Sequence, residues 1–348
     1  MNLIKFRKQK VLVASWASTE LAFINFLKAS CIQSDVEFEL VKISHHESWF
    51  SAKRSYIKNV VHLLKQFIHV LMLMLRFDVK VVYFGTNLNR VFFLFSFLTK
   101  ESFYIYNEIP FESKKSLVYL IDKFVFSYFN NVYVSSNERA SYVRSFYGLK
   151  KHVGVLENCA FTAFSELPEV TFEEKFSALF SGSVSGKRFN GEIYPKFRKF
   201  FEILGCKIDV YGLNSSGDLR IFSEEISSKG SVTHNEMMEI MNRYKYGILS
   251  YYTGEVNYDL CAPIKLYEYI SAGCIVVSMN KNLSLLNFAS QYPNLIIFVD
   301  DIESSDLSKF DRNRYLQERN AFLSSGVQSN KEFSLKVLGS DFYFSSAS

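Results

Sequence analysis

A regular alternation of short apolar runs with longer segments of helical periodicity, from Lys10 to about residue 300, constrains the fold more than any other feature of the sequence. Such alternation is typical of βα units stacked around parallel sheets. The 348 residues also exceed one ordinary core, because domains usually hold about 100–200 residues. The sequence therefore predicts an α/β protein with two domains.

The apolar runs divide into two Rossmann-like series. Strands are predicted at 11–16, 38–43, 79–84, 102–107, 131–136 and 153–158, and again at 176–181, 207–212, 246–252, 274–279 and 295–300. Helices are predicted near 18–27, 60–77, 90–98, 115–129, from Asn137, at 195–204, 234–244 and 262–273, and from Ser304. The periodicity breaks after residue 158. We therefore expect an N-terminal domain at 1–160, a linker at 161–175, a C-terminal domain at 176–325 and a tail at 326–348.

Charge is distributed unevenly between the two halves. Residues 1–160 contain 21 Lys and Arg against 12 Asp and Glu, a net charge of +9. Such a half suits a membrane surface or a phosphate-bearing partner, although a scattered basic surface without a partner is the alternative. We expect no nucleic-acid partner, because no recognition motif accompanies the charge. The five cysteines are never spaced as C-x-x-C, which supports neither a zinc site nor a disulfide framework.

The stretch 60–77 is the most membrane-like part of the sequence. Its longest uncharged run, 66–75, has 10 residues, whereas a membrane span needs about 20. It is therefore either a buried helix of the first domain or a basic amphipathic helix in a membrane interface. The N-terminus lacks the features of a signal peptide, so we expect a cytoplasmic protein that associates peripherally with the inner face of the membrane.

The segment 257–273, NYDLCAPIKLYEYISAG, holds the sharpest chemical signal. Pro263 suits the first turn of a helix, and Gly273 its end. Lys265 and Glu268 then share one face near the helix N-terminus, where a cation and free amides favour a diphosphate. The carboxylate one turn later can accept ribose hydroxyls. The alternative is an ordinary surface ion pair.

This segment resembles the nucleotide-binding half of GT-B glycosyltransferases, especially retaining bacterial enzymes of surface-polysaccharide synthesis such as O-antigen and capsule. The resemblance implies two Rossmann-like domains facing each other across a cleft, with a C-terminal helix that crosses back to the first domain. It also implies that Glu268 binds the donor ribose and that Lys265 approaches the phosphates. The positions that match the family pattern or join the implied donor site are Asn257, Pro263, Lys265, Leu266, Glu268, Tyr269, Ala272 and Gly273.

Two further segments resemble donor-site loops of the same family. In 180–190, Gly182 allows close approach of the backbone, and Lys187 or Arg188 holds the pyrophosphate. In 229–241, the resemblance places Val232 and Thr233 near the base, while His234 is expected to cap the next helix. One departure is Leu260, which stands where many relatives carry a first glutamate; Glu255 or Asp259 is an alternative source of that carboxylate.

The expected reaction is transfer of a sugar from a UDP- or GDP-sugar to a hydroxyl of a glycan, plausibly lipid-linked. Lys187, Lys265 and helix amides would stabilise the leaving diphosphate, so we expect no metal and no cofactor. Glu108 is the candidate acid or base facing the cleft, its alternative being a solvated loop carboxylate beside Pro110. Two other functions stay open: an inert nucleotide-sugar-binding scaffold, which the missing glutamate favours, and a nucleotide-sugar epimerase.

Overall fold

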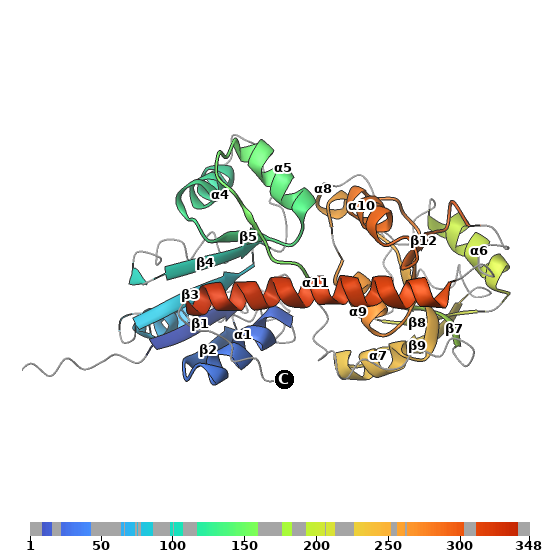
Figure 1. Cartoon of the computed structure of the whole chain (residues 1–348), viewed down its shortest axis with the longest axis horizontal. Coiled ribbons are helices and arrows are strands. Elements are labelled where there is room, and N and C mark those ends of the chain that lie inside the picture. Colours follow the sequence, from blue (N-terminus) through green and yellow to red (C-terminus); the bar gives the residue numbers. More distant parts are fainter. Residues whose placement is uncertain are drawn as a thin grey trace, which may run out of the picture. The chain divides into compact units, whose positions relative to one another are not determined.

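The chain divides into two compact units, which Figure 1 shows in a computed structural model. The first unit consists of Met1–Glu157 and Gln328–Ser348, and the second of Asn158–Val327. The described residues are 9–15, 22–42, 64–65, 67–73, 75, 78–85, 98–99, 101–106, 117–158, 176–182, 193–205, 207–212, 226–251, 256–261, 263–302 and 311–339. The predicted linker at 161–175 lies outside these residues.

The first unit contains a six-stranded parallel sheet in the order β2-β1-β3-β4-β5-β6. All six predicted strands are confirmed to within a few residues. The strands are β1 (Gln9–Ser15), β2 (Glu37–Lys42), β3 (Asp78–Phe84), β4 (Glu101–Tyr106), β5 (Val132–Val134) and β6 (Gly154–Val155), and the helices are α1 (Ala22–Gln33), α4 (Leu117–Tyr128) and α5 (Asn137–Tyr147).

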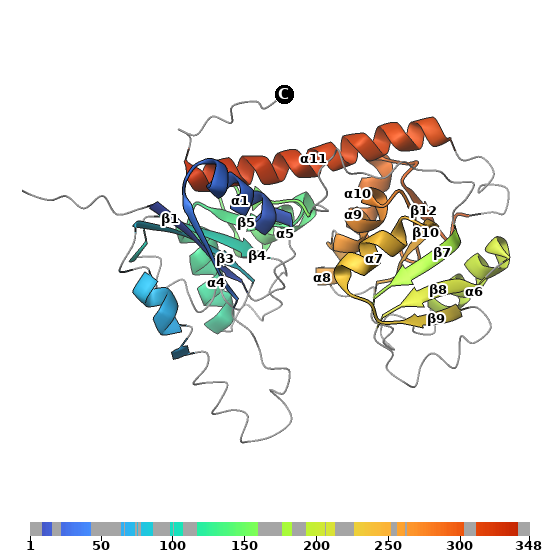
Figure 2. The ribbon, with the colours of Figure 1, turned by 90° about the horizontal axis from the view of Figure 1, so that it is seen from below.

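Both faces of this sheet are covered, as expected for a parallel sheet with apolar strands. On one face, Val81, Tyr83 and Tyr104 pack with residues of α4, α5 and the helical stretch around Val70. On the other face, Val82 and its neighbours pack with α1 and with the end of the last helix, α11 (Arg312–Leu338). Figure 2 shows α1 and α11 on one side of the strands and α4 on the other.

The second unit contains another six-stranded parallel sheet, in the order β12-β11-β10-β7-β8-β9. The chain adds β8 and β9 on one side of β7 and then returns to add β10, β11 and β12 on the other side. The strands are β7 (Phe176–Ser181), β8 (Ile208–Tyr211), β9 (Ile226–Gly230), β10 (Tyr244–Leu249), β11 (Ile275–Ser278) and β12 (Ile296–Phe298), and the helices are α6 (Ile193–Leu204), α7 (His234–Met241), α8 (Val256–Asp259), α9 (Ile264–Ser271) and α10 (Leu283–Gln291). The direction of strand order thus reverses between β7 and β10.

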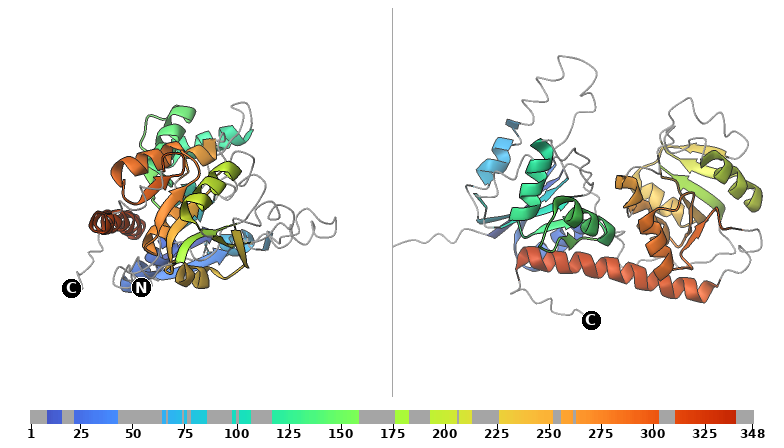
Figure 3. Two further views of the ribbon diagram at one scale, coloured as in Figure 1. Left: turned by 90° about the vertical axis from the view of Figure 1, so that its right-hand side faces the viewer. Right: turned by 90° about the horizontal axis from the view of Figure 1, so that it is seen from above.

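The single helix α11 contributes to both units, and Figure 3 follows it from two sides. In the second unit, the Tyr315 hydroxyl donates to the Cys274 carbonyl at 2.9 Å. In the first unit, Asn330 Nδ2 donates to the Glu157 carbonyl at 3.1 Å, and Phe333 and Val337 enter the core. The last helix therefore returns to the first unit, as the family resemblance implied.

Some elements differ from the prediction. The helix predicted at 234–244 ends at Met241, because Tyr244 already belongs to β10. Neither β9 nor α10 was predicted. Only Ile226 of β9 is buried, so this edge strand lacks the apolar run by which the other strands are recognised.

Candidate nucleotide-binding site

The helix that carries Lys265 and Glu268 begins beside the point where strand order reverses. In open parallel sheets, ligands bind outside the carboxyl ends of the strands at such a reversal. Here the reversal lies between β7 and β10. The chain leaves the carboxyl end of β10, forms α8, and then begins α9 at Ile264. The amino end of α9 and Gly182, which follows β7, therefore belong to the same edge of the sheet.

The Tyr269 side chain connects α9 to β7 and β10, the two strands between which the strand order reverses. Its hydroxyl accepts a hydrogen bond from the Ser181 backbone N–H at 2.9 Å and donates to the Ile248 carbonyl at 3.2 Å. The side chain is wholly buried. Burial raises the pKa of Tyr269 well above its usual value, so the hydroxyl stays neutral and can fill both roles. The resemblance included Tyr269 only as a matching residue and gave no reason for it.

Two close approaches at this edge require glycine. A Cβ on Gly247 of β10 would lie 2.4 Å from the Tyr269 ring. A Cβ on Gly212, after β8, would lie 1.9 Å from the carbonyl oxygen of Gly182. Gly182 in turn donates its N–H to the Tyr211 carbonyl at 2.9 Å. Gly182 therefore stands at the carboxyl end of β7, close to the backbone at Gly212. Its predicted approach to a ligand stays a prediction.

Glu268 is the central side chain of the candidate site. It is only 5% exposed. Its Oε2 lies 2.5 Å from Lys265 Nζ, and its Oε1 lies 3.8 Å from Nδ1 of His234. The contact with Lys265 is a close ion pair, and within the described part of the chain no further hydrogen bond reaches the buried Oε2. A carboxylate oxygen has two acceptor sites, so Oε2 can accept another donor from a ligand.

His234 was expected to cap α7, and this expectation is wrong. Thr233 is the N-cap residue: its side chain accepts from the Glu236 N–H, and the Thr233 backbone N–H donates to Glu236 Oε2 at 2.8 Å. Because this capping box satisfies the helix end, His234 is left on the first turn and faces Glu268. Sequence reasoning missed this contact, since 34 positions separate the two residues.

The amino end of α9 lacks the side-chain cap that other helices have. Ser136, Thr233 and Asn282 cap α5, α7 and α10 with side-chain oxygens. The N-cap of α9 is Pro263, which makes no such hydrogen bond. Pro263 was expected within the first turn and instead directly precedes it. Pro263 therefore gives no side-chain cap to the first amides of α9, which lie at the positive end of the helix dipole.

The structure places the remaining predicted donor residues in different surroundings. The Leu266 side chain is buried in the core of the second unit. Val232 and Thr233 are exposed, with Thr233 engaged in the cap. Asn257 lies in α8, but its side chain is outside the described residues, as are Glu108, Lys187 and Arg188. Leu260, at the position of the missing glutamate, is buried.

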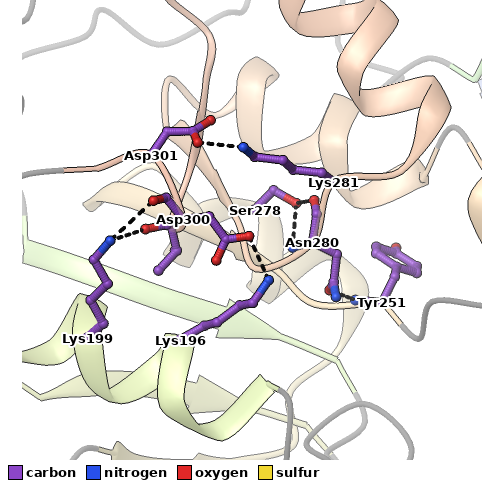
Figure 4. Close-up of polar contacts among 9 residues, drawn as sticks. Lys196, Lys199, Tyr251, Ser278, Asn280, Lys281, Asp300 and Asp301 are labelled. Atoms are coloured by element: carbon purple, nitrogen blue, oxygen red, sulfur yellow. Dashed lines mark hydrogen bonds and ion pairs between the residues drawn. The ribbon is translucent and has the colours of Figure 1, made fainter.

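The structure adds two buried asparagines after β11 that the sequence analysis did not single out. Asn280 Oδ1 accepts from the Tyr251 backbone N–H at 3.1 Å (Figure 4). Asn282 Nδ2 donates to the Tyr258 carbonyl at 3.0 Å. Both bonds hold the segment between β10 and α9, and thus the approach to the amino end of α9. The sequence signal that could have identified them is the pair Asn280 and Asn282 directly after a buried strand.

Further ion pairs tie the neighbouring strand end to α6. Lys196 Nζ lies 2.8 Å from Asp300 Oδ2, and Lys199 Nζ donates to the Val299 carbonyl at 2.8 Å (Figure 4). Lys281, between the two asparagines, pairs with Asp301 at 2.5 Å. Non-covalent contacts thus join α6 to the segment after β12, and that segment to the loop after β11.

Among the described residues, no group of three His, Cys, Asp or Glu side chains is arranged to hold a metal ion. The expectation of metal-independent chemistry stays a prediction.

No family model matches the sequence, and no curated protein matches it. Solved structures do resemble it. HepE from Anabaena, in complex with UDP and glucose, is 12% identical with a TM-score of 0.56, and the match covers 94% of this chain and 99% of that one. WaaG, a glycosyltransferase involved in lipopolysaccharide biosynthesis, is 12% identical with a TM-score of 0.52, covering 93% and 95%. A putative UDP-N-acetylglucosamine 2-epimerase from Listeria monocytogenes is 10% identical with a TM-score of 0.52, covering 93% and 90%.

These likenesses extend over both units of the chain. At such low identity they establish architecture and not chemistry, and the third structure is named for a reaction other than sugar transfer. The chain therefore has the GT-B fold of two six-stranded parallel α/β units.

Proposed function

We propose that this protein is a glycosyltransferase that binds a UDP- or GDP-sugar at the carboxyl edge of the second sheet and transfers the sugar to a glycan hydroxyl. The observation that carries the proposal is the buried Glu268 carboxylate beside Lys265, near the amino end of α9. A carboxylate has two oxygens and about four acceptor sites, so the ion pair with Lys265 leaves acceptor sites for further donors. The two hydroxyls of a ribose would be such donors.

Positive groups beside Glu268 suit the diphosphate of the same ligand. Lys265 belongs to the first turn of α9, whose N-cap residue Pro263 makes no side-chain hydrogen bond to the helix amides. When the sugar leaves, negative charge grows on the diphosphate, and fixed cations and amides stabilise that charge. Lys187 and Arg188 would join them from the loop after β7.

Two of the similar structures and the charge of the first half support a proposal about the acceptor. HepE binds UDP and glucose, and WaaG acts in lipopolysaccharide biosynthesis. The net charge of +9 in residues 1–160 favours an anionic surface. We therefore propose a lipid-linked glycan acceptor in cell-surface polysaccharide synthesis, met at the inner face of the cell membrane.

Donor binding is tested by nucleotide-dependent thermal unfolding and by calorimetry. A ligand present at 100 times its Kd stabilises the folded state by about 2.7 kcal/mol. UDP or GDP should raise the Tm of the wild type, and Glu268→Gln should weaken binding roughly ten- to hundredfold, because hydrogen bonds to a charged group contribute about 1.5–3 kcal/mol.

Asp301→Asn is the matched control, since it removes a carboxylate from another ion pair at the same sheet edge. It should leave nucleotide affinity unchanged. If Asp301→Asn weakens binding as much as Glu268→Gln, or if no nucleotide shifts the wild type, the site is wrong.

An epimerase is the second candidate, because the Listeria structure has the same fold. The two reactions differ in their need for an acceptor. Incubation with UDP-sugars should release UDP only when a lipid-linked glycan is added. An epimerase would instead interconvert the UDP-sugar alone, as seen by NMR, and an inert scaffold would bind nucleotide without turnover.

A further inference from the structure

The solvent side of α4 carries an unbroken apolar stripe. Its members recur every three or four residues and so lie on one face of the helix. They are exposed by 41% to 72%, and they are Leu117, Leu120, Phe124 and Tyr128. The Phe124 and Tyr128 rings stack, with centroids 5.2 Å apart. Surface helices of a water-facing domain normally present polar residues there.

A second stripe lies on the helical stretch between residues 64 and 75. It follows the same spacing and is exposed by 49% to 60%; its members are Leu64, Ile68, Met72 and Leu75. Val70, on the opposite side, is buried in the same core cluster as Tyr119 and Val125 of α4. Both helices therefore cover the same face of the first sheet, as the right-hand view of Figure 3 shows, and turn their apolar sides away from it.

Such stripes are unusual, whereas single exposed apolar residues are normal on any protein. In the described part of the second unit, the large apolar side chains counted as exposed are Val232, Ile264, Leu283 and Leu286. They come from three separate places. The two four-residue stripes together, which we call the apolar face, are therefore a property of the first unit.

The charges on the apolar face indicate which partner it meets. Lys65 and Lys123 are exposed between the apolar residues. The acidic residue of α4, Asp122, is fully buried, and the stretch 64–75 contains no Asp or Glu. His69 is the polar exception, contacting Glu39 of β2 at 3.2 Å. Within the described parts of the two helices, the apolar stripes are thus accompanied by cations and by no exposed carboxylate, which matches an anionic lipid surface.

We propose that the apolar face docks on anionic phospholipid bilayers, with both helices lying in the interface plane. None of the described helices has the length and apolarity needed to cross a membrane. The inference deepens the proposed function and rests on it for its purpose: docking would bring the first unit to a lipid-linked acceptor. As a docking surface, the apolar face is inferred only from the exposure and charge of its residues and does not depend on the donor site.

The test is flotation of the full-length protein with phosphatidylcholine vesicles, with and without phosphatidylglycerol. The wild type should float with the anionic vesicles and lose binding at high salt. Two double variants, Leu120→Glu with Phe124→Glu and Ile68→Glu with Met72→Glu, should each weaken partitioning by about tenfold or more, because they place carboxylates where acyl chains would lie.

Leu283→Glu with Leu286→Glu is the matched control, since it makes the same change on exposed residues of α10. It should float like the wild type. All variants change solvent-facing side chains, and unaltered Tm values verify that they fold. Equal losses in the control, or no flotation of the wild type, would overturn the proposal. So would a wild-type dimer that the face variants dissociate while vesicle binding persists.

The UDP thermal shift separates this proposal from the previous one. Face variants should keep the full shift, since the donor site lies in the second unit. A wild type that floats but ignores all nucleotides would leave the docking surface standing and remove the donor site. A wild type that binds UDP but never floats would do the reverse.

Discussion

Replacing Tyr269 by Phe should remove the hydrogen bonds that connect α9 to β7 and β10. The change leaves the ring against Gly247 but removes the hydroxyl between Ser181 and Ile248. A buried N–H without an acceptor costs about 1–3 kcal/mol, and the lost bond to Ile248 adds about 0.5–1 kcal/mol. We therefore expect the second unit to lose about 1.5–4 kcal/mol. In a unit of this size each kcal/mol lowers Tm by about 2–4 °C, which gives a decrease of roughly 3–16 °C.

Calorimetric unfolding measures this change, and Tyr246→Phe is its control. That variant removes a buried tyrosine hydroxyl from the same sheet without touching the bridge, and it should cost less than about 1 kcal/mol. Because Glu268 directly precedes Tyr269, UDP affinity should also fall several-fold in Tyr269→Phe alone. If both variants unfold at the same temperature, the hydroxyl bridge does not hold α9, and the reasoning fails.

Two further expectations concern the first unit. Tyr133→Phe should raise its stability by about 1 kcal/mol, because the buried Tyr133 hydroxyl has no hydrogen-bond partner in the described part of the chain and its desolvation is uncompensated; a lower Tm would contradict this. Burial opposes the ionisation of Glu39, but hydrogen bonds from Lys10 and His69 outweigh it and lower its pKa. A lowered pKa stabilises the fold above the unfolded-state value, and the effect is lost as pH falls through the folded-state value. Glu39→Gln should therefore be less stable than the wild type at neutral pH, and the two Tm curves should converge in acid.

The strands were predictable because a parallel sheet covered on both faces needs nearly continuous apolar runs. Strands such as β1 and β11 are recognisable from such runs. Strand β9 has no such run, because it is an edge strand that is held by pairing with β8. The same locality made the Lys265–Glu268 pair predictable, because three positions along a helix bring two side chains together.

Contacts between distant positions were beyond the sequence. His234 reaches Glu268 only because α7 and α9 pack within one unit, and Asn280 serves Tyr251 from 29 positions away. The role of His234 was also misjudged for a local reason. Both Thr233 and His234 suit a helix start, and the capping box with Glu236 decides between them.

The division of the chain has a consequence for its synthesis. The core of the first unit includes Phe333, Val337 and Leu338 of α11, yet the rest of that unit ends at Glu157. At roughly 5–20 residues per second, the ribosome needs on the order of ten to thirty seconds to make the intervening second unit. During that time one face of the first sheet waits without its last helix. The first half to be translated is therefore the last to be completed, and the nascent chain must keep that open face from aggregating until its final turns emerge.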